Sequence, residues 1–201
     1  MSRYHIVTTW RVPGTVEEVA AVLGDVEALP LWWPSVYLEA REREPGDDQG
    51  VGKVVALRTK GWLPYTLAWE FRVTEVDPGT GSGGRVVLEP RGDFTGRGEW
   101  ALRQEGTAEA PVTVACYDWD VVARKPLLRA LTPLLRPLLA ANHDWAMRRG
   151  EESLRLELAR RRAATPAERA RVPPPPGPSR LTFGRQPGPR IRRATRLSAR
   201  R

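Results

Sequence analysis

The sequence has one cysteine, Cys116, and two histidines among its 201 residues. A single thiol excludes an intrachain disulfide framework, and two histidines exclude a histidine-rich metal site. The chain begins Met-Ser-Arg-Tyr-His, without an apolar signal segment. Together with the lone cysteine, this start predicts a reducing, cytoplasmic location. The sequence predicts no metal site and no cofactor.

Long hydrophobic runs are also missing. A membrane-spanning helix needs about 20 consecutive apolar residues. The best candidate, residues 126–141, is interrupted by Arg129 and Arg136. We therefore predict no membrane-spanning segment.

Charge is unevenly distributed along the chain. The totals are 32 basic and 24 acidic residues, a net charge of +8. Residues 163–201 contain ten arginines and one acid, a net of +9, so residues 1–162 carry 22 basic and 23 acidic groups, a net of −1. The basic segment also holds 8 of the 19 prolines. This division predicts a folded domain over residues 1–162 and a disordered Pro/Arg-rich tail over residues 163–201.

Most of the domain has the pattern of short strands. Residues 4–12 are rich in β-branched and aromatic side chains and end at Pro13-Gly14, which predicts a strand followed by a break. Thr15 and Glu18 have the spacing of a capping box, so we expect a short helix to about Gly24 and a second helical turn within residues 25–34. Short connections favour antiparallel pairing of the remaining strands, which are predicted at residues 36–44, 53–60, 65–76, 85–90, 96–104 and 112–123.

The last folded segment is predicted to be one long helix, from Pro126 to about Arg162. His143, Met147, Gly150 and Leu154 fall on one face at helical spacing, and we expect this face to point at the sheet. A glycine on that face lets helix and sheet approach closely. The order of elements predicts an α+β domain whose antiparallel sheet wraps one C-terminal helix.

Four stretches of the chain stand out together: Trp10–Asp25, Leu29–Val36, residues 96–102 with 114–121, and Asn142–Leu154. In this order they resemble the START-like SRPBCC superfamily, in particular its polyketide cyclase/dehydratase and lipid-transport branch. The resemblance covers residues 4 to about 160 and leaves the tail without a counterpart. It implies a helix-grip fold, with a seven-stranded sheet curved around the long helix, two short helices after the first strand, and a cavity between sheet and helix. Members bind sterols, lipids or polyketides, and some catalyse ring closure or dehydration.

Bulky side chains on the predicted strands and on the closing helix are the candidate ligand-binding residues. Indoles bring a large apolar area and one N–H donor, which suits a cavity wall, although tryptophans also fill ordinary cores. Three tryptophans lie mid-strand with alternating partners and are the better lining candidates. The predicted site consists of Trp69, Phe71, Trp100, Tyr117, Trp119, Leu139, Asn142 and His143.

Three functional hypotheses follow. The leading one is a carrier or binding protein for a hydrophobic small molecule or lipid, with Asn142 or His143 setting the ligand's orientation. The second is a cyclase- or dehydratase-type enzyme that uses His143 as general acid or base with a carboxylate. Against it, a lone histidine on such a face is also typical of a hydrogen-bonded core residue, and Asp118 and Asp120 face solvent if Trp119 faces inward.

The third hypothesis is an adaptor that binds nucleic acid or an anionic membrane through its arginines. A solubilising extension explains the same composition. The sequence leaves open the choice between binding and catalysis, the oligomeric state and the identity of the ligand.

Overall fold

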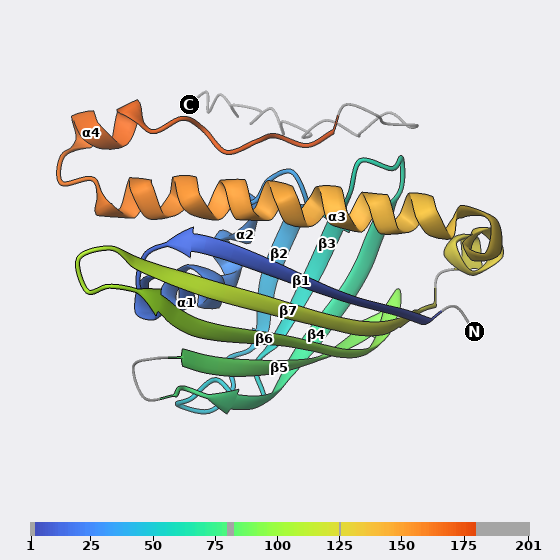
Figure 1. Ribbon diagram of the computed structural model, residues 1–201. Coiled ribbons are helices and arrows are strands. Elements are labelled where there is room, and N and C mark those ends of the chain that lie inside the picture. The colour runs from blue at the N-terminus through green and yellow to red at the C-terminus, as the bar shows by residue number, and fades with distance from the viewer. Residues whose placement is uncertain (1–2, 80–82, 125, 180–201) are drawn as a thin grey trace, which may run out of the picture.

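The computed structural model describes residues 3–79, 83–124 and 126–179. In the described residues, seven strands form one antiparallel sheet in the order β1-β7-β6-β5-β4-β3-β2. Figure 1 shows this sheet curving beneath one long helix. The strands are β1 (Arg3–Pro13), β2 (Tyr37–Glu44), β3 (Val54–Lys60), β4 (Thr66–Asp77), β5 (Gly83–Gly92), β6 (Phe94–Gly106) and β7 (Pro111–Ala123).

The helical elements lie in two places along the chain. Three short ones separate β1 from β2: α1 (Val16–Gly24), the 3-10 helix η1 (Val26–Ala28) and α2 (Leu29–Trp32). The long helix α3 (Pro126–Arg162) follows the sheet, and α4 (Pro166–Arg171) follows α3. This arrangement confirms the predicted α+β, helix-grip class. Among the described residues, no helix is long and apolar enough to cross a membrane.

The first strand pairs with the last one. Their register runs without a break from Arg3 opposite Val122 to Pro13 opposite Val112. Even-numbered side chains of β1 therefore point to the concave face, where Trp10 and Val12 are buried. The same alternation places Tyr4 and Ile6 beside the inward-facing end of β7.

Helix α1 begins as the sequence predicts. Thr15 Oγ1 accepts a hydrogen bond from the Glu18 backbone N–H at 3.3 Å, and Glu18 Oε2 accepts one from the Thr15 N–H at 2.9 Å. Glu18 also forms an ion pair with Arg162, the last residue of α3, at 2.6 Å. The start of α1 is thus tied to the end of α3.

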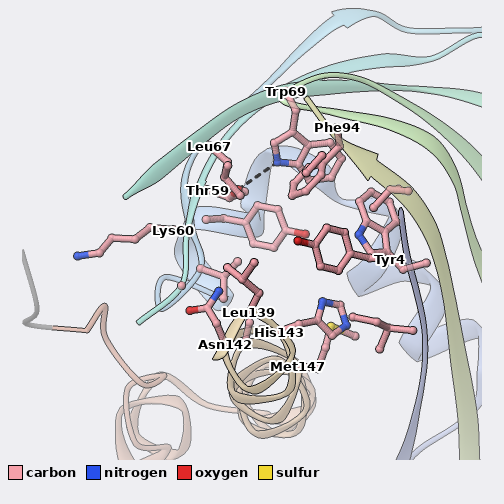
Figure 2. A pocket seen from close by; sticks show the side chains of 18 of the residues that line it. Tyr4, Thr59, Lys60, Leu67, Trp69, Phe94, Leu139, Asn142, His143 and Met147 are labelled. Carbon is pink, nitrogen blue, oxygen red and sulfur yellow. Dashed lines mark hydrogen bonds between the residues drawn. The ribbon is translucent and has the colours of Figure 1, made fainter. Parts of the chain in front are cut away.

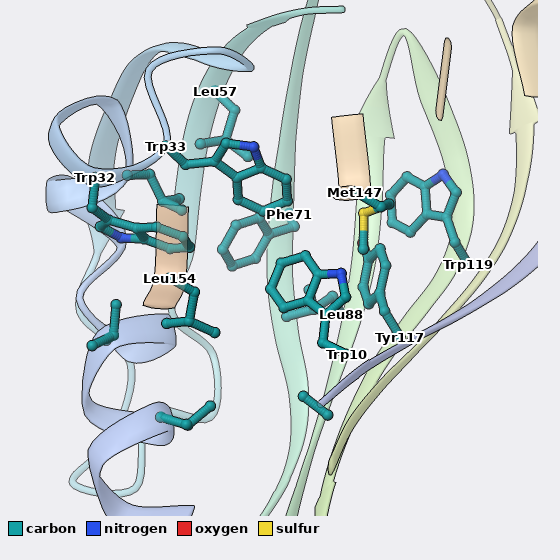
Figure 3. Packing of buried hydrophobic residues seen from close by; sticks show 14 of the residues in the cluster. Trp10, Trp32, Trp33, Leu57, Phe71, Leu88, Tyr117, Trp119, Met147 and Leu154 are labelled. Carbon is teal, nitrogen blue, oxygen red and sulfur yellow. The ribbon is translucent and has the colours of Figure 1, made fainter. Parts of the chain in front are cut away.

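Helix α3 turns its predicted face towards the sheet. Met147 and Leu154 are buried, and Gly150 is buried between them. Leu158 continues the same face one turn later. These side chains pack on the cluster shown in Figure 3, in which Trp32, Trp33, Phe71, Trp10 and Tyr117 line the interior between the short helices and β7.

The segment after α3 differs from the predicted disordered tail. The boundary after Arg162 coincides with the end of α3, and residues 163–179, which the prediction assigned to the tail, include α4. Thr165 and Glu168 form a second capping box that begins α4, and Arg160 Nη2 donates a hydrogen bond to the Pro173 carbonyl at 3.0 Å. These contacts hold the segment along the outer side of α3 (Figure 1). Residues 180–201 lie outside the described part of the chain.

Candidate functional site

Two cavities open on the concave side of the sheet. The first, which we call the α3 cavity, has a volume of about 150 Å³ and lies between the sheet and the first half of α3. The second, which we call the α1 cavity, has a volume of about 380 Å³ and lies between the sheet and the short helices. Close packing leaves few voids larger than a water molecule in a protein interior, so spaces of this size are candidate binding sites.

All four tyrosines of the chain line the α3 cavity. Figure 2 shows the cavity, with Trp69 and Phe94 on the sheet side and Leu139, Asn142, His143 and Met147 on the helix side. Residues from β1, β2, β3, β4, β6 and β7 complete the wall. The strand residues in this wall are Tyr4, Ile6, Tyr37, Thr59, Lys60, Leu67, Trp69, Phe94, Tyr117, Trp119, Val121 and Ala123.

His143 is the one histidine in the α3 cavity wall. Its Nε2 atom is buried and has no hydrogen-bond partner. Burial lowers the pKa of His143 from its ordinary value because desolvation disfavours the imidazolium, while the Asp144 carboxylate acts in the opposite direction. The ring is therefore neutral at pH 7 and has a nitrogen available to a ligand.

Asn142 closes the cavity towards the β3–β4 hairpin. Its Oδ1 atom accepts a hydrogen bond from the Leu63 backbone N–H at 3.2 Å. The contact is close because residue 61 is glycine: a Cβ there would fall 2.1 Å from Asn142 Oδ1. Helix and hairpin thus meet through an amide side chain.

Burial also raises the pKa of three tyrosines in the cavity wall. Desolvation raises the pKa of Tyr65 to about 12, with a further contribution from Tyr4. Burial raises the pKa of Tyr37 and of Tyr117 still further above the ordinary value. Their hydroxyl groups are therefore neutral across the physiological range and can donate hydrogen bonds.

Lys60 lines the cavity, but its ammonium group points away from it. Figure 2 shows its side chain extending away from the cavity, and its ammonium group donates to the Ser179 carbonyl at 3.3 Å. Ser179 is the last residue that the structure describes, and the Arg-rich residues 180–201 lie outside the described part of the chain. Contact of these arginines with nucleic acid or an anionic membrane stays a prediction.

The α1 cavity has a more apolar wall. Its deep side is formed by strand residues such as Phe71, Val73, Leu88 and Trp100, and α1 contributes Val16 and Leu23. The charged residues among those that line it are Lys53, Asp77 and Arg85. Each has a partner: Glu42 lies 3.2 Å from Lys53, Glu75 lies 2.8 Å from Arg85, and the Gly79 N–H lies 3.0 Å from Asp77.

Four aromatic residues line both cavities: Trp33, Tyr37, Trp69 and Tyr117. Tyr117 is stacked between Trp100 and Trp119, with ring centroids 4.4 and 5.5 Å away. Trp33 packs edge-on against Tyr37 at 5.1 Å. We call these four residues the aromatic partition, because they separate the two spaces.

The eight predicted site residues are divided between the cavities. Trp119, Leu139, Asn142 and His143 line the α3 cavity, and Phe71 and Trp100 line the α1 cavity. Trp69 and Tyr117 line both. The sequence predicts the eight residues as one site, because the packing of the aromatic partition cannot be derived from strand or helix periodicity.

Several wall residues were missed. Tyr4 was accessible to sequence reasoning, since it shares the even-numbered face of β1 with Trp10. Tyr65 shares the odd-numbered positions of the predicted strand 65–76 with Trp69 but was not included in the predicted site. Trp33 and Tyr37 follow the short helix α2, and no periodic pattern there indicates which way a side chain points.

Asp118 and Asp120, the carboxylates considered for acid–base catalysis, lie on the outer face of the sheet. Trp119 is buried, and the exposed Asp118 pairs with His5 at 3.0 Å. Asp120 pairs with Arg3 at 2.5 Å. No carboxylate is present among the described residues that line the α3 cavity, and no group of acidic, histidine or cysteine side chains in the described chain has the arrangement of a metal site.

Comparison with known proteins gives matches in structure. No protein-family model and no curated protein sequence matches the chain. The Zhui aromatase/cyclase from Streptomyces sp. R1128 superposes with a TM-score of 0.59 at 20% identity, covering 81% of this chain and 98% of that one. A START superfamily protein from Mycobacterium smegmatis has a TM-score of 0.50 at 18% identity, with 75% and 98% covered.

A third match is the di-domain ARO/CYC BexL from the BE-7585A biosynthetic pathway. It has a TM-score of 0.52 at 10% identity, covering 76% of this chain and 49% of that one. These likenesses show that the chain has the START-like helix-grip fold that its sequence resembles.

Proposed function

We propose that this START-like helix-grip protein binds a hydrophobic small molecule or lipid between its curved sheet and α3. The observation that carries the proposal is the pair of apolar-walled cavities on the concave face, beside a core of buried aliphatic and aromatic side chains. Burial of an apolar ligand contributes about 25 cal/mol for each Å² removed from water. Solved neighbours that include an aromatase/cyclase and a START superfamily protein support this general kind of ligand.

A few polar groups would orient the ligand in the α3 cavity. The free Nε2 of His143 accepts a hydrogen bond in one tautomer and donates one in the other. The neutral hydroxyl groups of Tyr65 and Tyr117 are further donors. An apolar wall with a small number of polar groups is the usual composition of a small-molecule site.

Native mass spectrometry of the protein purified from its own host tests this proposal. The expected result is a second species, heavier than the bare chain, that loses a lipid or polyketide-sized molecule on collisional activation. Denatured protein from the same preparation should give the bare mass, which separates non-covalent binding from modification. A preparation that gives the bare mass alone, and that also fails to bind added apolar probes, contradicts the proposal.

The same cavity supports a second candidate function, acid–base catalysis on a carbonyl compound. The observation that favours it is the unpartnered, neutral His143 ring on one side of the cavity and protonated tyrosines on the other. In this proposal His143 Nε2 takes a proton from the carbon next to the carbonyl. A tyrosine hydroxyl then hydrogen-bonds the oxygen on which the negative charge develops.

Acetophenone in D2O provides a direct test of this candidate. If His143 abstracts the proton, the wild-type protein accelerates the exchange of the ketone's methyl hydrogens for deuterium, as observed by NMR. The variant His143→Gln should lose the acceleration. His5→Gln is the matched control, because His5 is the chain's other histidine and lies on the outer face of the sheet. An equal loss in both variants, or no acceleration by the wild type, contradicts catalysis by His143.

A further inference from the structure

We propose that the α1 cavity is a binding site of its own, with a separate mouth, for an uncharged flat apolar molecule larger than a single ring. This extends the proposed function from the α3 cavity to the other side of the aromatic partition. Of the described residues that line the α1 cavity, none belongs to α3. The long helix that defines the first site therefore takes no part in the second.

The mouth of the α1 cavity is marked by the exposed members of its wall. These come from α1 and from the turns that join β2 to β3 and β4 to β5: Ala20, Gly24, Gln49, Asp77 and Pro78. In Figure 1 the β2–β3 turn lies at the lower edge of the sheet, away from α3. Every described residue that lines the α3 cavity is buried or half-buried. A ligand can thus enter the α1 cavity without passing α3.

The aromatic partition keeps the two spaces apart. Tyr117 is fixed by stacking on both of its faces, with the Trp100 ring 4.4 Å and the Trp119 ring 5.5 Å away. Trp33 is held against Trp10 at 5.4 Å and against Tyr37 at 5.1 Å. Because several rings would have to move together to join the cavities, we infer that each is occupied independently.

The cations at the α1 cavity argue against an anionic ligand. Lys53 and Arg85 are the cations in its described wall, and both are neutralised by glutamates. Arg85 is shared between two of them, Glu75 at 2.8 Å and Glu99 at 3.5 Å. An anionic group would have to displace one of these carboxylates and would leave the displaced charge near an apolar wall.

Volume sets the size of the ligand. The α3 cavity has a volume of about 150 Å³. A cavity of about this volume accommodates one benzene ring. The α1 cavity, at about 380 Å³, falls within the range of roughly 300–1,000 Å³ found for small-molecule sites. A fused-ring ligand therefore fits entirely within the α1 cavity, whereas the α3 cavity can enclose only part of it.

Prodan, an uncharged naphthyl ketone whose fluorescence rises in apolar surroundings, is the probe for this site. Val86→Phe fills the α1 cavity from β5, and Ala20→Trp covers its mouth from an exposed helix position that tolerates a large side chain. Ala146→Phe fills the α3 cavity and serves as the matched control. Thermal unfolding of each variant establishes that it is folded before prodan is added.

The wild-type protein should bind prodan at one site. Binding should weaken at least about tenfold in Val86→Phe and Ala20→Trp, and it should be unchanged in Ala146→Phe. Methyl 2-naphthoate should displace the probe at least about tenfold more effectively than the anionic 2-naphthoate, since these two competitors differ in charge but share the ring system.

Three outcomes overturn the inference. Loss of binding in Ala146→Phe, with the other two variants unaffected, places the ligand in the α3 cavity and leaves the proposed function standing. Loss in all three variants means that the cavities act as one site. Absence of prodan binding to the wild type, or binding unchanged in every variant, contradicts both this inference and an apolar site on the concave face.

Discussion

Gly150 lies so close to Trp33 that a Cβ atom at position 150 would fall 2.3 Å from Cζ2 of the indole. The two residues come from elements far apart in the sequence: α3 and the residue that follows α2. Trp33 is also part of the aromatic partition. The missing side chain of Gly150 thus allows α3 to rest on the indole that separates the two cavities.

The variant Gly150→Ala is expected to be less stable than the wild type. Overpacking costs about 1–3 kcal/mol, while replacing a helix glycine by alanine returns about 1 kcal/mol, so we expect a net loss of up to about 2 kcal/mol in the free energy of unfolding. Chemical denaturation measures this change. Gly24→Ala, at a helix position where a Cβ meets nothing within 4 Å, is the control and should be neutral or stabilising. Equal stabilisation by both substitutions would show that Gly150 is not confined by Trp33.

The Gly150–Trp33 contact illustrates what the sequence does and does not reveal. Helical spacing is sufficient to place Gly150 on the inward face of α3 and to predict a close approach there, because a helix has one fixed periodicity. The sequence did not predict that Trp33 would be the residue in contact with Gly150. Trp33 follows a four-residue helix that contains Pro30, and its direction depends on how that helix packs. Periodicity carries no information about such a position.

The same limit applies to the cavities. Strand alternation correctly turns Trp69, Phe71 and Trp119 inward, since successive side chains point to opposite faces. It does not indicate which rings meet across the sheet. The stacking of Tyr117 on Trp100 depends on the register of β6 with β7, which places these two residues opposite each other. The residues predicted as one site therefore line two cavities, which the aromatic partition separates.

A second prediction concerns the contact between α3 and the β3–β4 hairpin. Gly61→Ala pushes the Asn142 amide away, since the new Cβ would lie 2.1 Å from Oδ1. The Leu63 N–H then loses its acceptor. Hydrogen exchange of the Leu63 amide should accelerate about twofold to tenfold, which corresponds to a net hydrogen-bond contribution of about 0.5–1.5 kcal/mol.

Asn142→Ala should accelerate exchange at Leu63 to a similar extent, because it removes the same acceptor. Ala141→Ser, at the neighbouring exposed position of α3, is the control and should leave Leu63 unchanged. If Leu63 exchanges equally in all three variants and in the wild type, the hydrogen bond does not hold the hairpin against α3.

His143 should make the protein less stable in mild acid. Its pKa is lowered by burial in the folded state, so the unfolded chain binds a proton at pH values where the folded chain does not. The free energy of unfolding therefore keeps its full value above the ordinary histidine pKa of about 6.5, and it falls as the pH decreases below that value. Between about pH 7 and about pH 5, the free energy of unfolding should decrease more steeply in the wild type than in His143→Gln.

His5→Gln serves as the control for this pH dependence. The side chain of His5 is 60% exposed and pairs with Asp118 on the outer face, so removing it leaves the desolvation of His143 in place. The acid slope of His5→Gln should match that of the wild type. A wild-type slope equal to that of His143→Gln would contradict a buried, neutral His143.

The tyrosines should produce the opposite dependence in alkali. Desolvation raises the pKa of Tyr65 to about 12 and that of Tyr37 and Tyr117 further, whereas an unfolded tyrosine ionises near about pH 10. Above that pH the unfolded chain releases protons that the folded chain keeps, so stability falls as the pH rises.

Near-ultraviolet absorbance should show these tyrosines ionising at higher pH in the native protein than in denaturant. Tyr117→Phe should flatten the alkaline loss of stability, because it removes one proton held by the fold. If Tyr37, Tyr65 and Tyr117 of the native protein ionised near about pH 10, the cavity wall would be open to water at these residues.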